Sequence, residues 1–214
     1  FNKDLLAQPC IMGILNVTPD SFSDGGRYAE IASALGQVRK MVEDGADIID
    51  IGGESTRPGS EPVTDEEQIR RVVPVISAVR SEFPDLPVSI DTSSSEVAQA
   101  ALSAGADLIN DVMAGTKDSG LLALAARMNA PIVLMHSQGE PKTMQDNPHY
   151  TDVVAEVLGF LNERIQAAQE AGIKRANIIV DPGIGFGKRK QDNLTLLAHL
   201  QDIVALGFPV LLGA

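Results

Sequence analysis

Polar side chains stand at or just after the ends of short apolar runs at six places along the 214-residue chain. Each run has the length and composition of a buried strand. The polar residues are mostly carboxylates and amides, which apolar packing does not require. A carboxylate accepts two hydrogen bonds at once, so an Asp with an Asn suits a heterocycle that presents adjacent N–H donors. The residues are Asn16, Asp50, Asp91, Asn110 with Asp111, His136 and Asp181.

Other chemistries find less support in the same residues. Metal-dependent hydrolysis favours histidine-rich ligation, but the three histidines, His136, His149 and His199, are not at ligand spacing. A glycosidase needs a carboxylate pair that flanks a sugar, and no feature selects one. Each strand-end residue alone is also compatible with a structural role, because Asp and Asn help chains turn. Six of them at matching positions favour a common site.

Three further segments bear on that site. The string NVTPDSFSDGG (16–26) follows the first apolar run and is too polar to form core. The string GGESTRPGS (52–60) follows the second run, and Arg57 brings a planar cation suited to an anion. DPGIGFGK (181–188) resembles a phosphate loop but fails both the GxxxxGK[ST] and the GxGxxG spacing.

Alternating elements must position these residues. Near copies, DGADIIDIG (44–52) and AGADLINDV (104–112), join a helix end to the next strand, which indicates a βα repeat. Short apolar strands reached through helices pair in parallel, and seven such units favour a (β/α)8 TIM barrel in the α/β class. We expect one domain over 1–214 that lacks its last helix, strand and helix. Strands are predicted at 11–15, 48–51, 88–90, 108–109, 132–135, 178–180 and 210–212, and helices at 29–43, 65–82, 95–104, 121–128, 153–171 and 193–206.

The composition of the chain limits the classes of molecule that it can bind and indicates the compartment in which it works. The formal net charge of −12 argues against nucleic acid and anionic membranes as partners, while local cations still allow a small anionic ligand. The single cysteine, Cys10, excludes an internal disulfide framework and favours a reducing compartment. No apolar run approaches the roughly 20 residues of a membrane span, and no signal peptide is visible. We therefore predict a cytoplasmic protein.

Together the motifs resemble the dihydropteroate synthase family of folate biosynthesis. They are NVTPDSFSDGG, IIDIGGESTRPGS, SIDTS, LINDV, LMHSQGEPKTMQ and DPGIGFGK, in the family's order from residue 11 to residue 188. The resemblance implies a (β/α)8 barrel, a homodimer, Mg²⁺ as cofactor and an alkyl-transfer enzyme. Its reaction condenses 6-hydroxymethyl-7,8-dihydropterin diphosphate with 4-aminobenzoate to give 7,8-dihydropteroate and diphosphate, and sulfonamides are inhibitors.

The resemblance also assigns roles to residues. It implies that Asp91, Asn110 and Asp181 hold the pterin ring beside Met135, with Asp20, Asp91 and Asp181 as catalytic carboxylates. It implies that Asn16 offers its carbonyl oxygen to Mg²⁺, a hard cation that prefers oxygen ligands. The implied 4-aminobenzoate pocket comprises Phe22, Ser55, Thr56, Arg57, Pro58 and Phe186.

Two departures from the family pattern stand out. Ser93-Ser94-Ser95 replaces a Lys-Pro pair after DTS, and we expect it to change helix capping rather than catalysis. The family's cationic segments after strands seven and eight have no counterpart before Ala214, so we expect the 214-residue chain to be a weak or inactive synthase. Two alternatives stay open: a pterin-binding methyltransferase that uses methyltetrahydrofolate and a corrinoid protein, and a noncatalytic pterin-binding protein.

Overall fold

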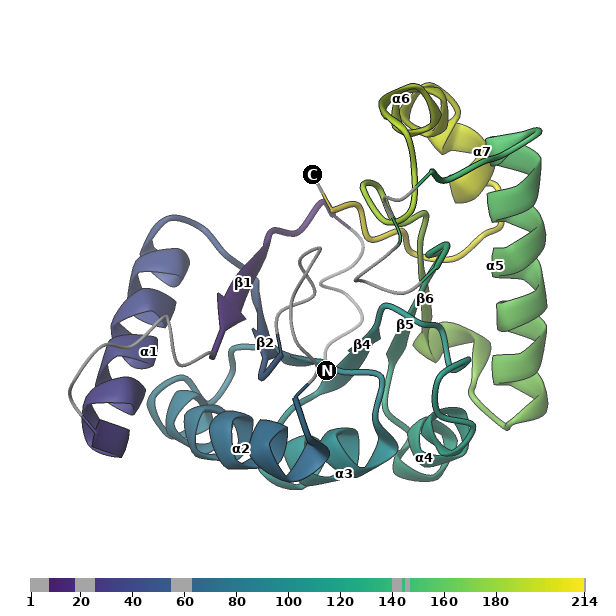
Figure 1. Ribbon diagram of the computed structural model, residues 1–214. Coiled ribbons are helices and arrows are strands. Elements are labelled where there is room, and N and C mark those ends of the chain that lie inside the picture. The colour runs from purple at the N-terminus through teal and green to yellow at the C-terminus, as the bar shows by residue number, and fades with distance from the viewer. Residues whose placement is uncertain (1–7, 18–25, 55–62, 140–143, 145–146, 214) are drawn as a thin grey trace. The chain divides into compact units, whose positions relative to one another are not determined.

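Helices and strands alternate along the chain in the computed structural model, which describes residues 8–17, 26–54, 63–139, 144 and 147–213. Figure 1 shows the order of the elements. The strands are β1 (Met12–Asn16), β2 (Ile48–Gly52), β3 (Val88–Asp91), β4 (Leu108–Asp111), β5 (Ile132–Met135) and β6 (Ile178–Asp181). The helices are α1 (Gly26–Glu43), α2 (Asp65–Glu82), α3 (Ser95–Ser103), α4 (Gly120–Met128), α5 (Val153–Glu170), α6 (Lys190–Ala198) and α7 (Leu200–Val204), with a 3-10 turn at Arg175–Asn177.

The described residues gather into two compact units. Those up to Asn110 form the first unit, and those from Asp111 onward form the second. Each unit has its own parallel strands and its own helices. The sequence-based expectation of one domain over residues 1–214 stays a prediction.

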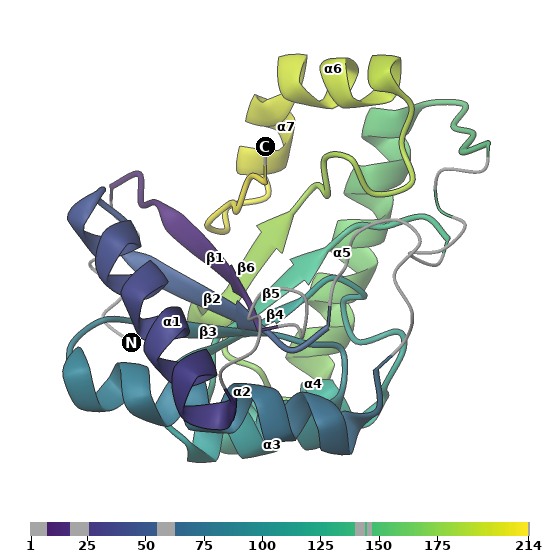
Figure 2. The same cartoon turned by 60° about the vertical axis from the view of Figure 1, so that its left-hand side comes forward.

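In the first unit the strands pair in parallel in the order β1, β2, β3, β4. Helix α1 packs against β1, α2 against β2 and α3 against β3 (Figures 1 and 2). Successive strand residues point to opposite faces, so Ile49, Ile51 and Ile90 share one face. All three are completely buried, as is Ile76 of α2. This apolar packing fixes the register of the strands. It therefore also fixes the positions of the polar residues on the opposite face.

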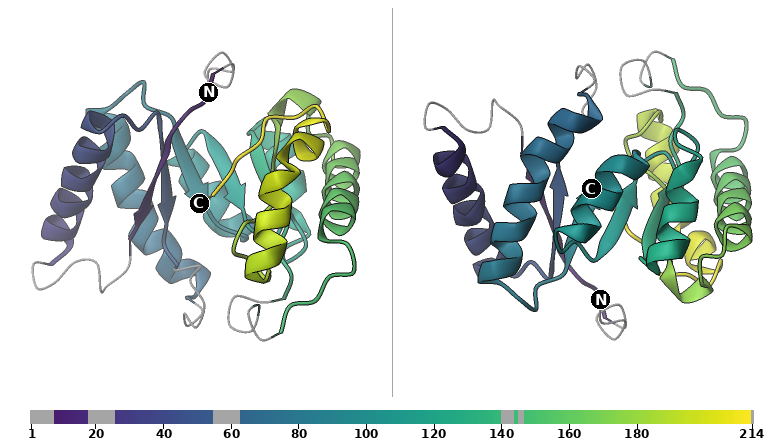
Figure 3. Two further views of the ribbon diagram at one scale, coloured as in Figure 1. Left: turned by 90° about the horizontal axis from the view of Figure 1, so that it is seen from above. Right: turned by 90° about the horizontal axis from the view of Figure 1, so that it is seen from below.

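In the second unit β5 pairs in parallel with β6, and α5 packs against both strands. Figure 3 shows α5 beside α6, and these two helices are in contact. Val133 and Val180 of the strands are fully buried together with Leu161 of α5. Burial of each such side chain contributes about 1.5–3 kcal/mol, which fixes the ends of β5 and β6 against each other.

The predicted elements differ from the observed ones mainly near the C-terminus. The strand expected at 210–212 is present only as a single parallel bridge between Val180 and Val210. The single helix expected at 193–206 is two helices, α6 and α7, separated at His199. The first begins three residues early because the Asp192 carboxylate accepts a hydrogen bond from the backbone N–H of Arg189 at 2.9 Å.

Helices α2 and α3 begin at the predicted residues, Asp65 and Ser95. Thr64 accepts a hydrogen bond from Glu67 N at the start of α2, and the Glu67 carboxylate pairs with Arg70 and Arg71. Ser94 caps α3 by accepting from Val97 N, which confirms a capping role for the serine segment. Within the part of the chain that the structure describes, no helix combines the length and apolar character required to cross a bilayer.

Candidate functional site

Four residues at the carboxyl ends of β1 to β4 lie in one row across the first unit. Asn16 pairs with Gly52, Gly52 pairs with Asp91, and Asp91 pairs with Asn110. Register partners on parallel strands point to the same face of the sheet. The structure therefore brings three predicted site residues of this unit, Asn16, Asp91 and Asn110, onto one edge and one face.

Gly52 leaves the row open beside Asp91. A Cβ atom placed on Gly52 would lie 3.5 Å from both Cβ and Oδ2 of Asp91, in ordinary van der Waals contact. A glycine at this position therefore places no side chain beside the Asp91 carboxylate. This role follows from the strand register, which the GGESTRPGS string alone does not reveal.

Asp50 lies one layer below this row and is not at a strand end. Strand β2 runs on to Gly52, so Asp50 pairs with Ile14 and with Ser89, and its side chain is only 3% exposed. Its Oδ2 accepts a hydrogen bond of 2.9 Å from Asn110 Nδ2. Burial raises the pKa of Asp50, while Ser89 and Asn110 act against that rise. Although Ser89 is close enough to affect the pKa, its Oγ and Asp50 Oδ1 form no hydrogen bond of normal geometry with the described residues.

In the second unit Asp181 and Met135 are register partners at the ends of β6 and β5. Asp181 is 5% exposed, and its Oδ1 accepts a 2.6 Å hydrogen bond from Gly183 N, which fixes the plane of the carboxylate. Burial raises the pKa of Asp181 to about 6, opposed by the Gly183 hydrogen bond and by Lys188. The carboxylate is therefore ionised at neutral pH and gains a proton in mild acid.

Lys188 organises the loop that follows β6. Its ammonium is buried, and Nζ lies 2.7 Å from the carbonyl oxygen of Gly183, 3.1 Å from that of Phe186 and 3.2 Å from that of His136. It also lies 2.9 Å from His136 Nδ1. Burial lowers the pKa of Lys188 to about 7, while Asp181 and Asp192 oppose the fall. The sequence pattern around this lysine predicts no role for it.

Two glycines of DPGIGFGK allow the loop to approach the chain after β5. Gly183 and Gly187 have φ of 67° and 61°, in the left-handed region. A Cβ on Gly183 would lie 1.9 Å from the carbonyl oxygen of His136, and one on Gly187 would lie 2.2 Å from that of Gln138. The glycines thus serve close backbone packing, which agrees with the sequence-based rejection of a phosphate loop.

Asp111 and His136, which the sequence pattern places at strand ends, have structural roles. The buried Asp111 carboxylate accepts hydrogen bonds from the backbone N–H groups of Met113 and Gly115 and so closes the turn after β4. The His136 ring packs edge-on against Phe160 with ring centroids 5.0 Å apart, and its Nδ1 faces Lys188. Burial and the Lys188 charge lower the pKa of His136 to about 3, so it stays neutral at physiological pH.

The low pKa of His136 predicts a loss of stability in acid. An unfolded chain binds a proton at His136 below about pH 6.5, whereas the folded chain does not until about pH 3. The free energy of unfolding should therefore fall by up to about 1.4 kcal/mol per pH unit between pH 6.5 and 4.5. Urea unfolding of wild type and His136→Gln across this range measures the effect. The variant should lack this slope, whereas the opposite contribution of Asp181 is common to both proteins; equal slopes would contradict the prediction.

Several predicted residues lie outside the described part of the chain. These are Asp20, Phe22, Ser55, Thr56, Arg57 and Pro58. Phe186 is described: it is half-buried, and its backbone N–H donates to the carbonyl oxygen of Gly183 at 3.1 Å. Its role in a 4-aminobenzoate pocket stays a prediction.

The described residues offer an oxygen donor for Mg²⁺ at one predicted position. Among them there is no group of three or more His, Cys, Asp or Glu side chains arranged to hold a metal ion. Asn16, at the end of β1, is half-buried and carries a side-chain carbonyl oxygen. Mg²⁺ keeps several water ligands and is commonly held by one or two protein oxygens together with substrate phosphates. Binding of Mg²⁺ by Asn16 together with a substrate phosphate stays a prediction.

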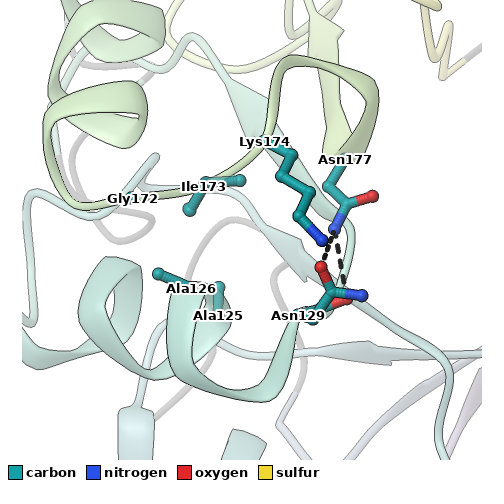
Figure 4. Close-up of a pocket in the computed structure, with 7 residues that line it drawn as sticks. All are labelled: Ala125, Ala126, Asn129, Gly172, Ile173, Lys174 and Asn177. Atoms are coloured by element: carbon teal, nitrogen blue, oxygen red, sulfur yellow. Dashed lines mark hydrogen bonds between the residues drawn. The ribbon is translucent and has the colours of Figure 1, made fainter.

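A pocket of about 190 Å³ lies at the amino ends of β5 and β6, away from Met135 and Asp181 at their carboxyl ends (Figure 4). Its polar wall is formed by Asn177, whose Nδ2 donates to the carbonyl oxygen of Asn129 at 3.1 Å. This bond ties the C-terminus of α4 to the start of β6. None of the predicted site residues lines the pocket.

Comparison with known proteins identifies the family. A model of the family described as pterin binding enzyme matches residues 12–214. The dihydropteroate synthase of Synechocystis sp. is 49% identical over 203 residues, which is 95% of this chain and 70% of that protein. The solved dihydropteroate synthase of Xanthomonas albilineans with 4-aminobenzoic acid is 51% identical, with a TM-score of 0.89 over 97% of this chain and 73% of its own. That of Yersinia pestis in a sulfonamide drug complex is 45% identical, with a TM-score of 0.90 over 97% of this chain and 75% of its own.

These relatives also settle the fold class. Solved dihydropteroate synthases are (β/α)8 barrels, which confirms the predicted α/β fold class. The chain covers 73% of the length of the Xanthomonas albilineans protein, which agrees with the prediction that it spans less than a full barrel. The prediction of a transferase is confirmed by the same relatives. The chain belongs to the pterin-binding enzymes and, among them, to the dihydropteroate synthase family.

Proposed function

We propose that the chain binds 6-hydroxymethyl-7,8-dihydropterin diphosphate and 4-aminobenzoate and joins them to 7,8-dihydropteroate with release of diphosphate. In balance, the bond between the pterin methylene carbon and the diphosphate oxygen breaks, a bond from the amine nitrogen to that carbon forms, and the amine loses a proton. The observation that carries the proposal is the row that places Asp91 and Asn110 side by side beside Gly52. Membership of the dihydropteroate synthase family supports the same reaction.

The proposal assigns the pterin to Asp91, Asn110, Met135 and Asp181. Asp181 suits the amino-pyrimidinone edge, because an ionised carboxylate accepts two parallel N–H bonds. The Gly183 N–H holds its orientation, and burial excludes competing water. Met135, 3% exposed and paired with Asp181, offers a polarisable apolar surface to a flat ring. Asp91 adds a second acceptor that can stabilise positive charge developing on the pterin.

The remaining assignments rest on the family. Asp20 is proposed as a catalytic carboxylate. Phe22, Ser55 to Pro58 and Phe186 are proposed to form the 4-aminobenzoate pocket, in which sulfonamides would compete. Mg²⁺ would be held by Asn16 and the substrate diphosphate, and it would supply charge neutralisation for the departing diphosphate.

The proposal also includes the oligomeric state of the protein and its location in the cell. A homodimer is supported by the exposed apolar side chains Leu194 and Leu197, which lie three residues apart on α6, together with Val204 of α7. A cytoplasmic location is supported by the presence of a single cysteine, Cys10, in the chain.

Calorimetric titration with 6-hydroxymethyl-7,8-dihydropterin diphosphate tests the function, with chromatographic detection of dihydropteroate as the second readout. We expect saturable binding to the 214-residue chain, and binding weakened at least tenfold in Asn110→Ala, which removes one hydrogen-bonding group from the row. Gln99→Ala, whose half-buried amide donates to Ser103 on α3, serves as a matched amide control and should bind as wild type. A wild-type chain that binds no pterin would refute the proposal.

A further inference from the structure

We infer that Asp50 is a positioning residue for the pterin, which acts by holding the Asn110 amide in one orientation. This inference rests on the proposed function, because it names how one member of the pterin site is set. Asp50 itself lies one layer below the row and is 3% exposed, so it acts through Asn110.

The geometry of the contact defines the orientation. Asp50 and Asn110 lie on β2 and β4, with β3 between them, and the 2.9 Å bond from Asn110 Nδ2 to Asp50 Oδ2 runs diagonally across β3. Asp50 Oδ2 accepts this bond, so it meets the Nδ2 end of the Asn110 amide and not the Oδ1 end. The Oδ1 end of Asn110 is therefore the one left for a ligand. It presents an acceptor to a pterin N–H, beside the acceptor that Asp91 presents.

The surroundings show that stability alone does not explain Asp50. A buried carboxylate is costly unless it is fully hydrogen-bonded, and Asp50 Oδ1 has no hydrogen bond to the described residues. Ser89, its register partner on β3, is completely buried, and its Oγ is likewise without one. An apolar residue would fill this layer at lower cost. What an apolar residue would lose is the acceptor that orients Asn110.

Two substitutions separate the acceptor from the bulk of the side chain. Asp50→Val keeps a strand-compatible side chain and removes the acceptor, so the Asn110 side chain is no longer held in any one rotamer or orientation. Asp50→Asn keeps an acceptor but adds a donor, so both orientations of Asn110 become possible and about half of the chains hold the competent one. We expect pterin affinity to fall roughly tenfold in Asp50→Val and about twofold in Asp50→Asn. Gln99→Ala, whose amide donates to Ser103 on α3 and not to Asp50 or Asn110, is the control and should bind as wild type.

A double-mutant cycle tests whether Asp50 acts through Asn110. In the Asn110→Ala background, Asp50→Val should change pterin affinity less than twofold, because the group that it positions is gone. Equal losses in both backgrounds would overturn the inference, as would an Asp50→Val single variant that binds as wild type. A purely structural role is also excluded by measurement: the urea midpoint should stay the same or rise in Asp50→Val, and a fall that parallels the loss of affinity would overturn the inference.

Nuclear magnetic resonance of the ligand-free chain gives a readout that does not need pterin binding. The Asn110 side-chain amide protons should exchange slowly with water in wild type and at least tenfold faster in Asp50→Asn and Asp50→Val. Equal exchange rates would overturn the inference even if pterin binds. A chain with protected Asn110 protons that binds no pterin would refute the proposed function while supporting the contact between Asp50 and Asn110.

Discussion

Asp181→Asn is expected to weaken pterin binding on the order of 100-fold, equivalent to about 3 kcal/mol. The Asp181 carboxylate is 5% exposed and held in one plane by Gly183 N, so its acceptors are already oriented in the free protein. An asparagine of the same shape keeps one acceptor and turns an N–H donor toward an N–H donor of the ligand. The loss therefore combines a missing charge-assisted hydrogen bond with a repulsive contact.

The same carboxylate should make pterin binding dependent on pH. Burial raises the pKa of Asp181 to about 6, so the ligand-binding ionised form predominates at pH 7 to 8 and is lost in acid. Affinity should fall toward tenfold per unit below pH 6. Of the groups that bear on this carboxylate, Lys188 lowers its pKa, and His136 stays neutral throughout. Asp181→Asn should lack the dependence.

Calorimetry with 6-hydroxymethyl-7,8-dihydropterin, which carries no diphosphate, measures both effects without a titrating phosphate. Asp202→Asn removes the same charge from α7, where the carboxylate is half-exposed beside His199, and should bind as wild type. The assignment of Asp181 fails if Asp181→Asn binds within threefold of wild type. It also fails if the variant retains the wild-type pH profile.

The predicted alternation of short strands and amphipathic helices agrees with the structure because local patterns determine it. Apolar runs of four or five residues and helix caps such as Thr64 act within a few residues of themselves. What the pattern could not predict was the register that aligns Asn16, Gly52, Asp91 and Asn110, since strand register depends on contacts between distant segments. Asp50 shows the consequence. The predicted strand ended at residue 51, which suggested that Asp50 was at the strand end, whereas the observed strand buries it one layer deeper.

The roles of residues that follow the end of a strand are harder still to predict from sequence. His136 follows the last residue of β5, where the alternation of faces no longer applies, and its ring turns toward Phe160 and Lys188. Lys188 itself is the opposite of what its residue type suggests, since lysine is rarely buried. The signal that could have found it is the spacing of Gly183, Gly185 and Gly187, which indicates a loop packed closely on another backbone.

Lys188→Met is expected to lower the free energy of unfolding by about 3 kcal/mol. Methionine replaces the apolar stem of the lysine side chain but cannot donate hydrogen bonds. The substitution leaves the carbonyl oxygens of Gly183, Phe186 and His136 without the ammonium that they now surround. Because these groups are largely buried, the loss is close to the full cost of desolvating unpaired acceptors rather than the small net value of an exposed hydrogen bond.

Urea unfolding measures this loss, and Lys190→Met is the matched control. Lys190 lies two residues further on, at the start of α6, and is exposed, so its replacement should change the unfolding free energy by less than about 0.5 kcal/mol. A second readout tests the specific contact. The Lys188 charge contributes to the low pKa of His136, so the pKa of that imidazole should rise in Lys188→Met when followed by nuclear magnetic resonance. If Lys188→Met unfolds within 1 kcal/mol of wild type and the pKa of His136 is unchanged, the ammonium does not hold this loop.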